Sequence, residues 1–443
     1  MAVTTTAWSQ LPNDVWSLIG NKLDVETDRC CFRLVSKSFN SSLPAFPQPP
    51  WLLLSESQFQ QQQPLLSSSS SEEKEEVKIV NEENHQQLSP PPPPLRGIVG
   101  IGGYGEHKDL VYEIELPEAH QMRCTGSTGN WLITVDKTDG IHLLNPFSRV
   151  QIDLPLQSTF KYGFDPDEDD FHVTPEQHRD NLLRKVIISS TSSLSNSNNK
   201  DCIIMAIHHY LKKLAIARPG DTSWTTVDTP YHFFEDVIFY KEQFYGVNHY
   251  GMVMVCDISD LHNPKATVVM ENWLNQNFYQ IKYLVEWMGE LLLVIKFVLK
   301  FFCWDNRQEC IEQKRTLYKT EKFEVYKLDF TIKKWEEVTS LGDYCLFLGS
   351  NSSVSVSAIN YFGSLKKNCI YFTDDHTFGY RATKTPGGHD MGVFDLKDKS
   401  IQPYYKGVST CYYSPPIWII PNPTAMNTKK ESDSLERKVD NNL

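Results

Sequence analysis

One glycine-rich segment of the chain has the spacing of a nucleotide-binding loop. Residues 100–105, GIGGYG, satisfy the G-x-G-x-x-G pattern, whose glycines let the backbone approach a pyrophosphate. That chemistry also needs a helix N-terminus after the glycines, because the helix end holds the phosphates. The residues that follow instead alternate Leu110, Tyr112, Ile114 and Leu116, as a strand does. We therefore expect no nucleotide cofactor here.

Two short segments near the C-terminus contain residue types that bind metals. TDDH, residues 373–376, and GGHD, residues 387–390, place Asp, His and Asp on either side of one loop. The adjacent His208 and His209 are expected to point to opposite faces of a strand, so they cannot readily hold one ion together. No spacing identifies a converging ligand set or an acid–base pair. We interpret TDDH and GGHD as solvated turns and expect no metal, no cofactor and no catalytic residue.

The ten cysteines are scattered along the chain without a C-x-x-C pair. The N-terminal residues MAVTTTAWSQ lack the positive n-region and long apolar h-region of a secretory signal. Cysteines of a protein that stays inside the cell remain reduced and behave as small core residues. We therefore expect an intracellular protein, located in the nucleus, the cytoplasm or both.

The composition is that of an ordinary globular chain with an acidic balance. With 443 residues, of which 40% are hydrophobic, the chain can bury a large core. The net charge of −12 argues against nucleic acid or an anionic membrane as the main partner, because both reward clustered Lys and Arg. The most apolar run, LLLVIKFVLKFF at 291–302, contains Lys296 and Lys300 and is shorter than the ~20 residues of a membrane span. We interpret it as a buried strand.

A strand-rich unit recurs between about Gly97 and Pro421. Its clearest copy begins at Asp236 and divides into DVIFY, QFYGVN, MVMVCDI and KATVV, separated by the turn segments KE, HYG and SDLHNP. Related hairpins place a short polar residue at the turn, where its side chain can bond back to the backbone; these residues are Asn145, Asp329 and Asp395. Repeated antiparallel meanders without helical crossovers predict a β-propeller.

The spacing of the meanders predicts about six four-stranded blades, some of them carrying insertions. Five blades are visible directly. The sixth is expected to combine strands near Trp51 and Val111 with the C-terminal segment PPIWIIP, which would close the ring and leave no free sheet edge. Neither the glycine pairs of kelch repeats nor the Trp-Asp ending of WD repeats recurs in the chain.

Two polar segments are expected to be disordered. Residues 56–95 combine Gln, Ser, Glu and Pro tracts that bury too little apolar surface to offset chain entropy, and the tail 426–443 is similarly polar. The proline run within the first segment favours polyproline II, either as a plain spacer or as a ligand for an SH3- or WW-type domain. The predicted domains are a helical block at 1–46 and a propeller at 47–425.

Residues 11–23, LPNDVWSLIGNKL, have apolar positions at helical spacing, with Pro12 suited to the first turn. A second helix is expected after Asp24 and a short third turn before Pro44. The pattern L-P-x-D…I-x-x-x-L…D…F-R-x-V-S-K-x-F resembles the F-box, a helical domain that docks on the Skp adaptor of SCF-type cullin ubiquitin ligases. A generic helical cap on the propeller is the alternative. The resemblance implies adaptor contacts from the following residues: Leu11, Pro12, Val15, Ile19, Leu23, Val35 and Phe39.

The remainder of the chain resembles the KIB-type, kelch-related propellers that follow the F-box in many plant proteins. The likeness rests on CTGSTGNWLITVDKTDGIHLLNPFSRVQIDLP at 124–155, DVIFYKEQFYGVNHYGMVMVCDI from Asp236 and the closing PPIWIIP. Together the two resemblances imply a mostly β protein with a three-helix F-box ahead of the propeller. They imply a non-catalytic substrate receptor, with the Skp adaptor, a cullin and an unidentified protein substrate as partners. A non-degradative scaffold and a propeller enzyme with a channel metal are the alternatives.

Loops between propeller strands are well suited to holding another protein, and aromatic or Arg side chains usually dominate such contacts. Three loops carry them, and ordinary packing between blades is the alternative for each. The candidate substrate-binding residues are Tyr231, Phe233, Phe234, His249, Tyr250, Phe378, Tyr380 and Arg381.

Overall fold

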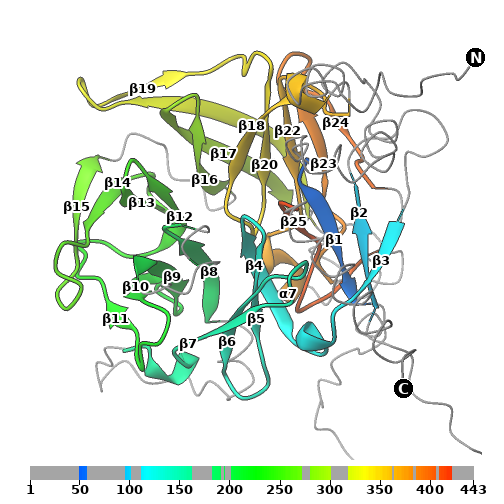
Figure 1. Cartoon of the computed structure of the whole chain (residues 1–443). Coiled ribbons are helices and arrows are strands. Elements are labelled where there is room, and N and C mark those ends of the chain that lie inside the picture. The colour runs from blue at the N-terminus through cyan, green and yellow to red at the C-terminus, as the bar shows by residue number, and fades with distance from the viewer. Residues whose placement is uncertain are drawn as a thin grey trace, which may run out of the picture.

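The chain forms a ring of six β-sheets around a common centre (Figure 1). The computed structural model describes residues 49–56, 95–100, 111–161, 182–190, 194, 201–271, 280–300, 318–361, 364–382, 386–405 and 409–421. Within these ranges the sheets are radial blades made almost entirely of antiparallel neighbours. The predicted mostly β propeller with about six blades is confirmed. The predicted F-box helices, most of the polar insertion and the tail lie outside the described residues.

The first three blades contain four strands each. Blade 1 consists of β25 (Ile417–Ile419), β1 (Trp51–Glu56), β2 (Leu95–Val99) and β3 (Val111–Glu115). Blade 2 consists of β4 (Arg123–Thr128), β5 (Trp131–Val135), β6 (Ile141–Leu144) and β7 (Gln151–Leu154). Blade 3 consists of β8 (Leu183–Ile188), β9 (Ile204–His208), β10 (Lys213–Ala217) and β11 (Thr225–Thr226).

The last three blades follow in chain order around the ring. Blade 4 consists of β12 (Phe234–Tyr240), β13 (Gln243–Asn248), β14 (Val253–Asp257) and β15 (Lys265–Met270). Blade 5 consists of β16 (Gln280–Trp287), β17 (Glu290–Lys300), β18 (Tyr318–Asp329) and β19 (Lys334–Glu337). Blade 6 consists of β21 (Val354–Ser357), β20 (Tyr344–Leu348), β22 (Cys369–Phe372), β23 (Gly392–Asp395) and β24 (Ile401–Gln402).

Blade 6 departs from the predicted four-stranded meander. It has five strands, and β22 runs parallel to β20. The reason is the order of the strands: β21 folds back on the inner side of β20, so the chain must cross to the outer side of β20 before β22 begins. The crossing includes a short 3-10 helix at Ala358–Tyr361. Two others lie at Pro117–Ala119 and Gln157–Thr159, and blade 6 also carries a six-residue α-helix, α7 (Thr377–Ala382).

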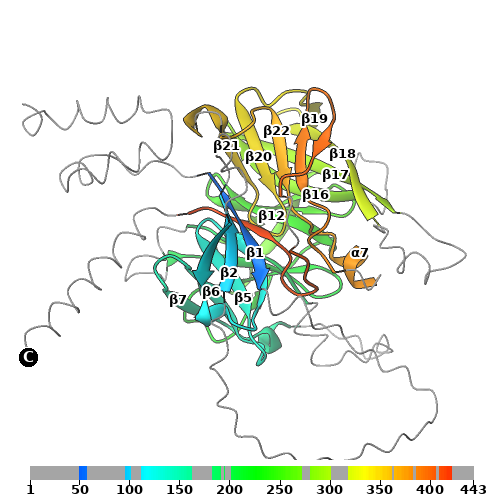
Figure 2. The same cartoon turned by 90° about the vertical axis from the view of Figure 1, so that its right-hand side faces the viewer.

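Blade 1 closes the ring by joining the two ends of the described chain. The C-terminal strand β25 runs beside β1 (Figure 2). The two strands pair antiparallel, with Leu52 opposite Trp418. The predicted closure by PPIWIIP is therefore confirmed. The sequence did not predict β2, because it placed Leu95 in the polar insertion together with Glu56. Both residues belong to strands, so the strands extend to residues 56 and 95 on either side of that segment.

The predicted turn residues bond back to the backbone as expected. Asp329 Oδ1 accepts the N–H groups of Thr331 and Ile332 at 2.8 and 3.1 Å. Asn145 Oδ1 accepts the N–H of Phe147 at 3.0 Å, and Asp395 repeats the arrangement. These side chains satisfy backbone donors that a tight turn would otherwise leave without partners.

The core lies between the blades, and each neighbouring pair of blades shares one buried cluster. The buried strand predicted at 291–302 is confirmed up to residue 300, where β17 ends, and Leu291 to Ile295 are fully buried in it; residues 301 and 302 lie outside the described residues. Cysteines 124, 202, 256, 345, 369 and 411 are buried and unbonded, as the sequence predicts for core residues. None of the helices in the described ranges is both long enough and apolar enough to cross a membrane.

Candidate functional site

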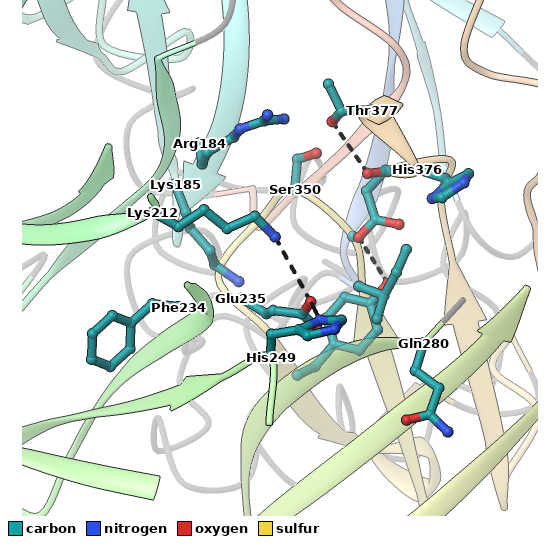
Figure 3. A pocket seen from close by; sticks show the side chains of 14 residues that line it. Arg184, Lys185, Lys212, Phe234, Glu235, His249, Gln280, Ser350, His376 and Thr377 are labelled. Carbon is teal, nitrogen blue, oxygen red and sulfur yellow. Dashed lines mark hydrogen bonds and ion pairs between the residues drawn. The ribbon is translucent and has the colours of Figure 1, made fainter. Parts of the chain in front are cut away.

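A pocket of about 520 Å³ opens where three inner strands begin. Its walls are formed by the first residues of β8, β12 and β16, by the turn between β9 and β10, and by the segments that follow β20 and β22. The volume falls within the ~300–1,000 Å³ of sites that bind small molecules or single side chains. In Figure 3, Arg184, Lys185 and Lys212 lie on one side of the pocket, and His376 and Thr377 lie on the other.

The first wall, from blades 3 to 5, is built around two neighbouring carboxylates of β12. Asp236 is paired with Lys185 of β8 and accepts the Leu284 N–H of β16 at 2.8 Å, so it connects three blades. Glu235 lies 2.9 Å from His249 Nδ1. It lies 3.7 Å from Lys212 Nζ and 3.9 Å from Lys282 Nζ.

Burial and neighbouring charges shift the pKa values of the residues on this wall in opposite directions. Burial alone would raise the pKa of Glu235, but the hydrogen bond with His249 and the ammonium groups of Lys212 and Lys282 outweigh it, so that pKa is lowered. Burial lowers the pKa of Lys212 and of Lys282 despite the attraction of Glu235. For Lys212 and Lys282, burial therefore disfavours the charged form by more than the attraction of Glu235 favours it.

Behind the second wall, between blades 5 and 6, lies a buried lysine surrounded by carboxylates, of which Asp375 lines the pocket. Lys296 Nζ of β17 lies 3.3 Å from Asp375 Oδ1 and 3.5 Å from Asp390 Oδ2, and its side chain is fully buried. Tyr283 donates its hydroxyl to Asp375 at 2.8 Å, and Tyr318 donates to Asp374 at 2.8 Å. Burial alone would lower the pKa of Lys296, but the three carboxylates raise it above its usual value.

The interpretation of TDDH and GGHD as solvated turns is wrong. Asp374 is 1% exposed, Asp390 6% and His376 8%, and the two segments meet across the loop. The Asp374 carboxylate accepts the Gly388 N–H at 2.9 Å, which joins the segments directly. Among the described residues, no three His, Cys, Asp or Glu side chains are placed to hold a metal ion. The positive charge between the carboxylates is instead that of Lys296.

Five aromatic side chains, three of them exposed and two half-buried, lie beside the pocket on the loops of blades 3 and 4. We call Tyr210, Tyr231, Phe233, His249 and Tyr250 the aromatic surface. Tyr210, Tyr231 and Phe233 are 45%, 43% and 39% exposed. His249 belongs to both features, because it lines the pocket and its ring contacts Tyr250 edge-on at 5.8 Å.

Phe233 has a left-handed backbone conformation, with φ at 62°. Such a conformation costs a bulky residue about 1–2 kcal/mol. It is held in place because the Phe233 N–H donates to Leu211 O at 2.7 Å and the Phe233 C=O accepts the His249 N–H at 2.8 Å. Strain retained for an exposed ring is typical of a residue with a binding role.

Of the eight predicted substrate-binding residues, the structure brings four to the aromatic surface and buries two. Phe234 is fully buried in the core between blades 3 and 4, and Tyr380 is 4% exposed against Val298 and Tyr318. The prediction that these two residues are exposed contacts is wrong, because both rings face the protein interior. Residues 378 and 381 lie on α7 rather than in a loop, and their side chains are outside the described set.

The remaining sequence candidates have separate outcomes. The seven predicted adaptor contacts and most of GIGGYG lie outside the described residues, while the strand predicted after GIGGYG is β3. His208 is fully buried and stacks on Phe160 at 4.0 Å, whereas His209 lies in the following turn against Tyr210. Burial lowers the pKa of His208 to about 3, so it stays neutral as a core residue.

Sequence reasoning missed Lys185, Lys212, Lys282, Lys296 and Tyr318. A lysine at an alternating strand position is usually interpreted as solvent-facing, and nothing local marks it as buried. The one available signal was Lys296 inside the apolar run of β17, where a charge requires a partner.

Backbone strain at Phe233 yields a test that separates the ring from its conformation. We expect Phe233→Gly to be more stable than Phe233→Ala by about 1 kcal/mol, because only glycine removes the left-handed penalty. Urea unfolding of both variants measures the difference. Tyr231 has no positive φ. There we expect Tyr231→Gly to be less stable than Tyr231→Ala, because glycine makes the unfolded chain more flexible. If the Gly variant is more stable than the Ala variant at both positions, or less stable at both, the backbone of Phe233 is not strained.

Comparison with known proteins gives this architecture a family. The model of the KIB1-4 β-propeller matches residues 104–395, which is more than half of the chain. The chain belongs to the KIB1-4 β-propeller family. The predicted resemblance to plant F-box proteins with KIB-type propellers is thereby confirmed, and the matched relatives bear F-box names.

Two Arabidopsis thaliana relatives illustrate the extent of this similarity. F-box protein SKIP23 is 28% identical over 233 residues, which are 51% of this chain and 56% of that protein. F-box protein At2g26160 is 28% identical over 296 residues, which are 60% of this chain and 83% of that protein. This chain thus spans little more than half the length of the first of these relatives.

Solved propellers overlap the chain only loosely. The β-propeller domain of Myceliophteria thermophila Cps50 (Swd1) is 7% identical, covers 70% of this chain and 81% of its own, and has a TM-score of 0.29. The fold assignment therefore rests on the strand pairing and on the family match.

Proposed function

We propose that this KIB1-4 propeller protein is a non-catalytic substrate receptor of an SCF-type ubiquitin ligase. Its N-terminal residues would bind the Skp adaptor and thereby a cullin, and the propeller would hold a protein substrate for ubiquitination. Its contribution to the chemistry would be proximity, since it raises the effective concentration of substrate lysines near a charged ubiquitin-conjugating enzyme. It would act inside the cell, in the nucleus, the cytoplasm or both.

The exposed aromatic surface is the observation that carries the proposal. Its three most exposed rings, Tyr210, Tyr231 and Phe233, lie on loops of two neighbouring blades, and the Phe233 N–H donates to Leu211 O between those loops. Tyrosine and phenylalanine on such loops provide large contact areas at low conformational cost. The F-box names of the relatives and the F-box pattern of residues 11–39 support the adaptor half of the proposal.

The adaptor half is tested by co-purification with a Skp adaptor. We expect the native chain to bind and the variant Leu11→Ala, Pro12→Ala, Ile19→Ala to lose binding by more than tenfold, because the contacts are apolar. The control is Tyr231→Ala on the aromatic surface, which should leave adaptor binding unchanged. Failure of the native chain to bind any Skp adaptor would contradict the ligase role.

The substrate half is tested by ubiquitin transfer in a reconstituted ligase with proteins that co-purify with the propeller. The variant Tyr231→Ala, Phe233→Ala should lose most of the transfer while it still binds the adaptor. If proteins bind to the aromatic surface but receive no ubiquitin from an assembled ligase, the chain is a scaffold and the receptor assignment is wrong.

A further inference from the structure

The directions of the inner strands give the ring two different faces. The pocket opens at the first residues of β8, β12 and β16, and we call this side the pocket face. Strand β4 runs beside β8 in the same direction. Near its start, Arg123 donates to Leu183 O at 2.9 Å. At its end, the Thr128 hydroxyl donates to Val186 O at 2.9 Å. The turn after β4, at Gly129, therefore lies on the opposite side, which we call the entry face.

The described part of the propeller begins on the entry face. Trp51, the first residue of β1, pairs with the last residue of β25. The next residue, Ile420, donates its N–H to Gly129 O at 2.9 Å. The Trp51 ring also lies edge-on to Phe147 in the turn after β6, with 6.0 Å between the ring centroids. Residues 1–48, which contain the F-box pattern, are thus joined to the propeller at the entry face.

The connection is too short to bring the F-box pattern to the pocket. Nine residues separate Phe39, the last residue of the pattern, from Pro49. Even fully extended, they span at most ~36 Å. The six residues of β1 rise about 20 Å, and neighbouring strands lie about 4.8 Å apart. By these spacings a path from Trp51 over the outer edge of blade 1 and back to the pocket exceeds ~40 Å. The pattern therefore stays on the entry side of the ring.

On the blade 2 side of Trp51, the entry face presents an exposed aliphatic side chain. Val150 is 46% exposed and lies in the turn between β6 and β7, the same turn as Phe147. Single exposed aliphatic residues are common on protein surfaces. What distinguishes Val150 is its place beside the point where the N-terminal residues are attached, because a segment joined at Trp51 can cover it.

On the blade 6 side, Ile359 has the same character. It is 62% exposed and lies in the 3-10 helix between β21 and β22. Its neighbour Ala358 donates its N–H to Asp343 O at 2.8 Å, just before β20, whereas Gly349, just after β20, lines the pocket. Ile359 is therefore on the entry face. Ala358 belongs to the buried cluster that blades 6 and 1 share, so Ile359 lies next to blade 1.

We propose that residues 1–48 pack on the entry face between Val150 and Ile359 and hold the Skp adaptor on that side, opposite the pocket. This inference rests on the proposed ligase role. The exposed rings Tyr210, Tyr231 and Phe233 lie before β10 and β12, on the pocket face. Adaptor and substrate then bind to opposite faces without competing, and the ring of sheets is the rigid spacer between them.

Exposed lysines report on the two faces separately. Four of them precede β22 or follow β23, at the strand ends away from the pocket: Lys366, Lys367, Lys397 and Lys399. Lys137 lies on the pocket face of blade 2, because its Nζ donates at 2.6 Å to Gln121 Oε1, just before β4. Lys319 lies on the pocket face of blade 5, next to Tyr318, which donates to Asp374.

The test is amine-reactive cross-linking of the full chain, alone and co-purified with a Skp adaptor, followed by mass spectrometry. The spacer is shorter than the height of a blade. We expect Lys22 and Lys37 of the F-box pattern, and lysines of the adaptor, to cross-link to the four blade 6 lysines but not to Lys137 or Lys319. Lys137 is the matched control, because blades 2 and 6 both flank blade 1. Cross-links to Lys137 or Lys319, or none to blade 6, would overturn the proposal.

A variant tests the packing itself. Val150→Asp, Ile359→Asp should lower the yield of cross-links from Lys22 and Lys37 to blade 6 several-fold, because a carboxylate cannot be buried against apolar side chains. The control is Met288→Asp, at a 65% exposed residue in the entry-face turn after β16 of blade 5. It should leave the yield unchanged. An unchanged yield in a folded Val150→Asp, Ile359→Asp protein counts against the proposal.

The chain alone separates this inference from the ligase role. If no Skp adaptor co-purifies, the ligase role fails, but cross-links from Lys22 and Lys37 to blade 6 still show where residues 1–48 pack. If the adaptor binds and the cross-links fall on the pocket face, the ligase role stands and this inference fails.

Discussion

Replacing Lys296 with methionine is expected to lower the free energy of unfolding by about 3–5 kcal/mol, because it leaves buried carboxylates without their cation. Methionine keeps most of the volume of the side chain, so the loss is electrostatic rather than a cavity effect. The three carboxylates Asp374, Asp375 and Asp390 would then face one another at the junction of blades 5 and 6. Urea unfolding at pH 7.5 measures the difference.

The loss in Lys296→Met should depend on pH in a defined direction. Burial already holds the pKa of Asp374 above its usual value, and Lys296 counteracts part of that increase. Without the lysine, the pKa of the folded state rises further above the unfolded value of about 3.9. When the pKa of a carboxyl group is higher in the folded than in the unfolded protein, the free energy of unfolding falls as the pH increases from the unfolded pKa to the folded pKa. The deficit relative to the native chain should therefore be larger at pH 8 than at pH 5.

Lys322→Met on the neighbouring strand β18 is the matched control. Lys322 pairs with Glu324 at 2.6 Å, but its side chain is 45% exposed. Exposed pairs contribute about 1 kcal/mol or less, so this variant should unfold close to the native midpoint at both pH values. A Lys296→Met protein as stable as the Lys322→Met control would show that the buried cluster does not need its ammonium group.

The blades were predictable because the residues that specify each hairpin lie close together in the sequence. Each hairpin combines alternating apolar residues with a turn residue such as Asn145, Asp329 or Asp395, and these signals occupy adjacent positions in the sequence. The closing strand was also predictable, since PPIWIIP is an apolar strand that has no partner nearby in the chain. Strand β2 was not, because its few residues directly follow a long polar tract.

The pocket was not predictable because it is assembled from distant residues. Lys296 meets Asp375 and Asp390 across two blades, and Glu235 meets Lys212 and Lys282 from the blades on either side. Apart from Lys296, which lies inside an apolar run, each of these residues, taken alone, resembles an ordinary surface charge. Only closure of the ring buries them together, and closure depends on every interface between neighbouring blades at once.

Closure makes Trp418 the second position at which a single change should have a large effect. Trp418 of β25 is 2% exposed, and its ring lies 5.1 Å from Phe347 and 5.2 Å from Tyr404 of blade 6. Its backbone pairs with Leu52 of β1, and its carbonyl accepts the hydroxyl of Ser127 in blade 2. One residue thus connects the last blade, the first blade and the second.

Trp418→Ala is expected to lower the free energy of unfolding by about 3–5 kcal/mol, the range for removing a buried aromatic ring. Trp418→Phe should lose clearly less, because it keeps an aromatic ring against Phe347, and Trp418 Nε1 has no hydrogen-bond partner within the described part of the chain. Trp335→Ala, on the outer strand β19 and only partly buried, controls for removal of a tryptophan as such. Urea unfolding compares the three variants.

If Trp418→Ala and Trp335→Ala unfold at the same midpoint, the C-terminal strand does not hold the ring closed. The expected order instead places Trp418→Ala lowest, because covalent continuity cannot replace the packing that this variant removes at the seam. Elsewhere the chain itself connects each blade to the next, whereas the N-terminal strands of blade 1 are joined to the end of the chain after blade 6 by pairing with β25, whose three residues include Trp418. The seam should therefore be the place where the ring opens first.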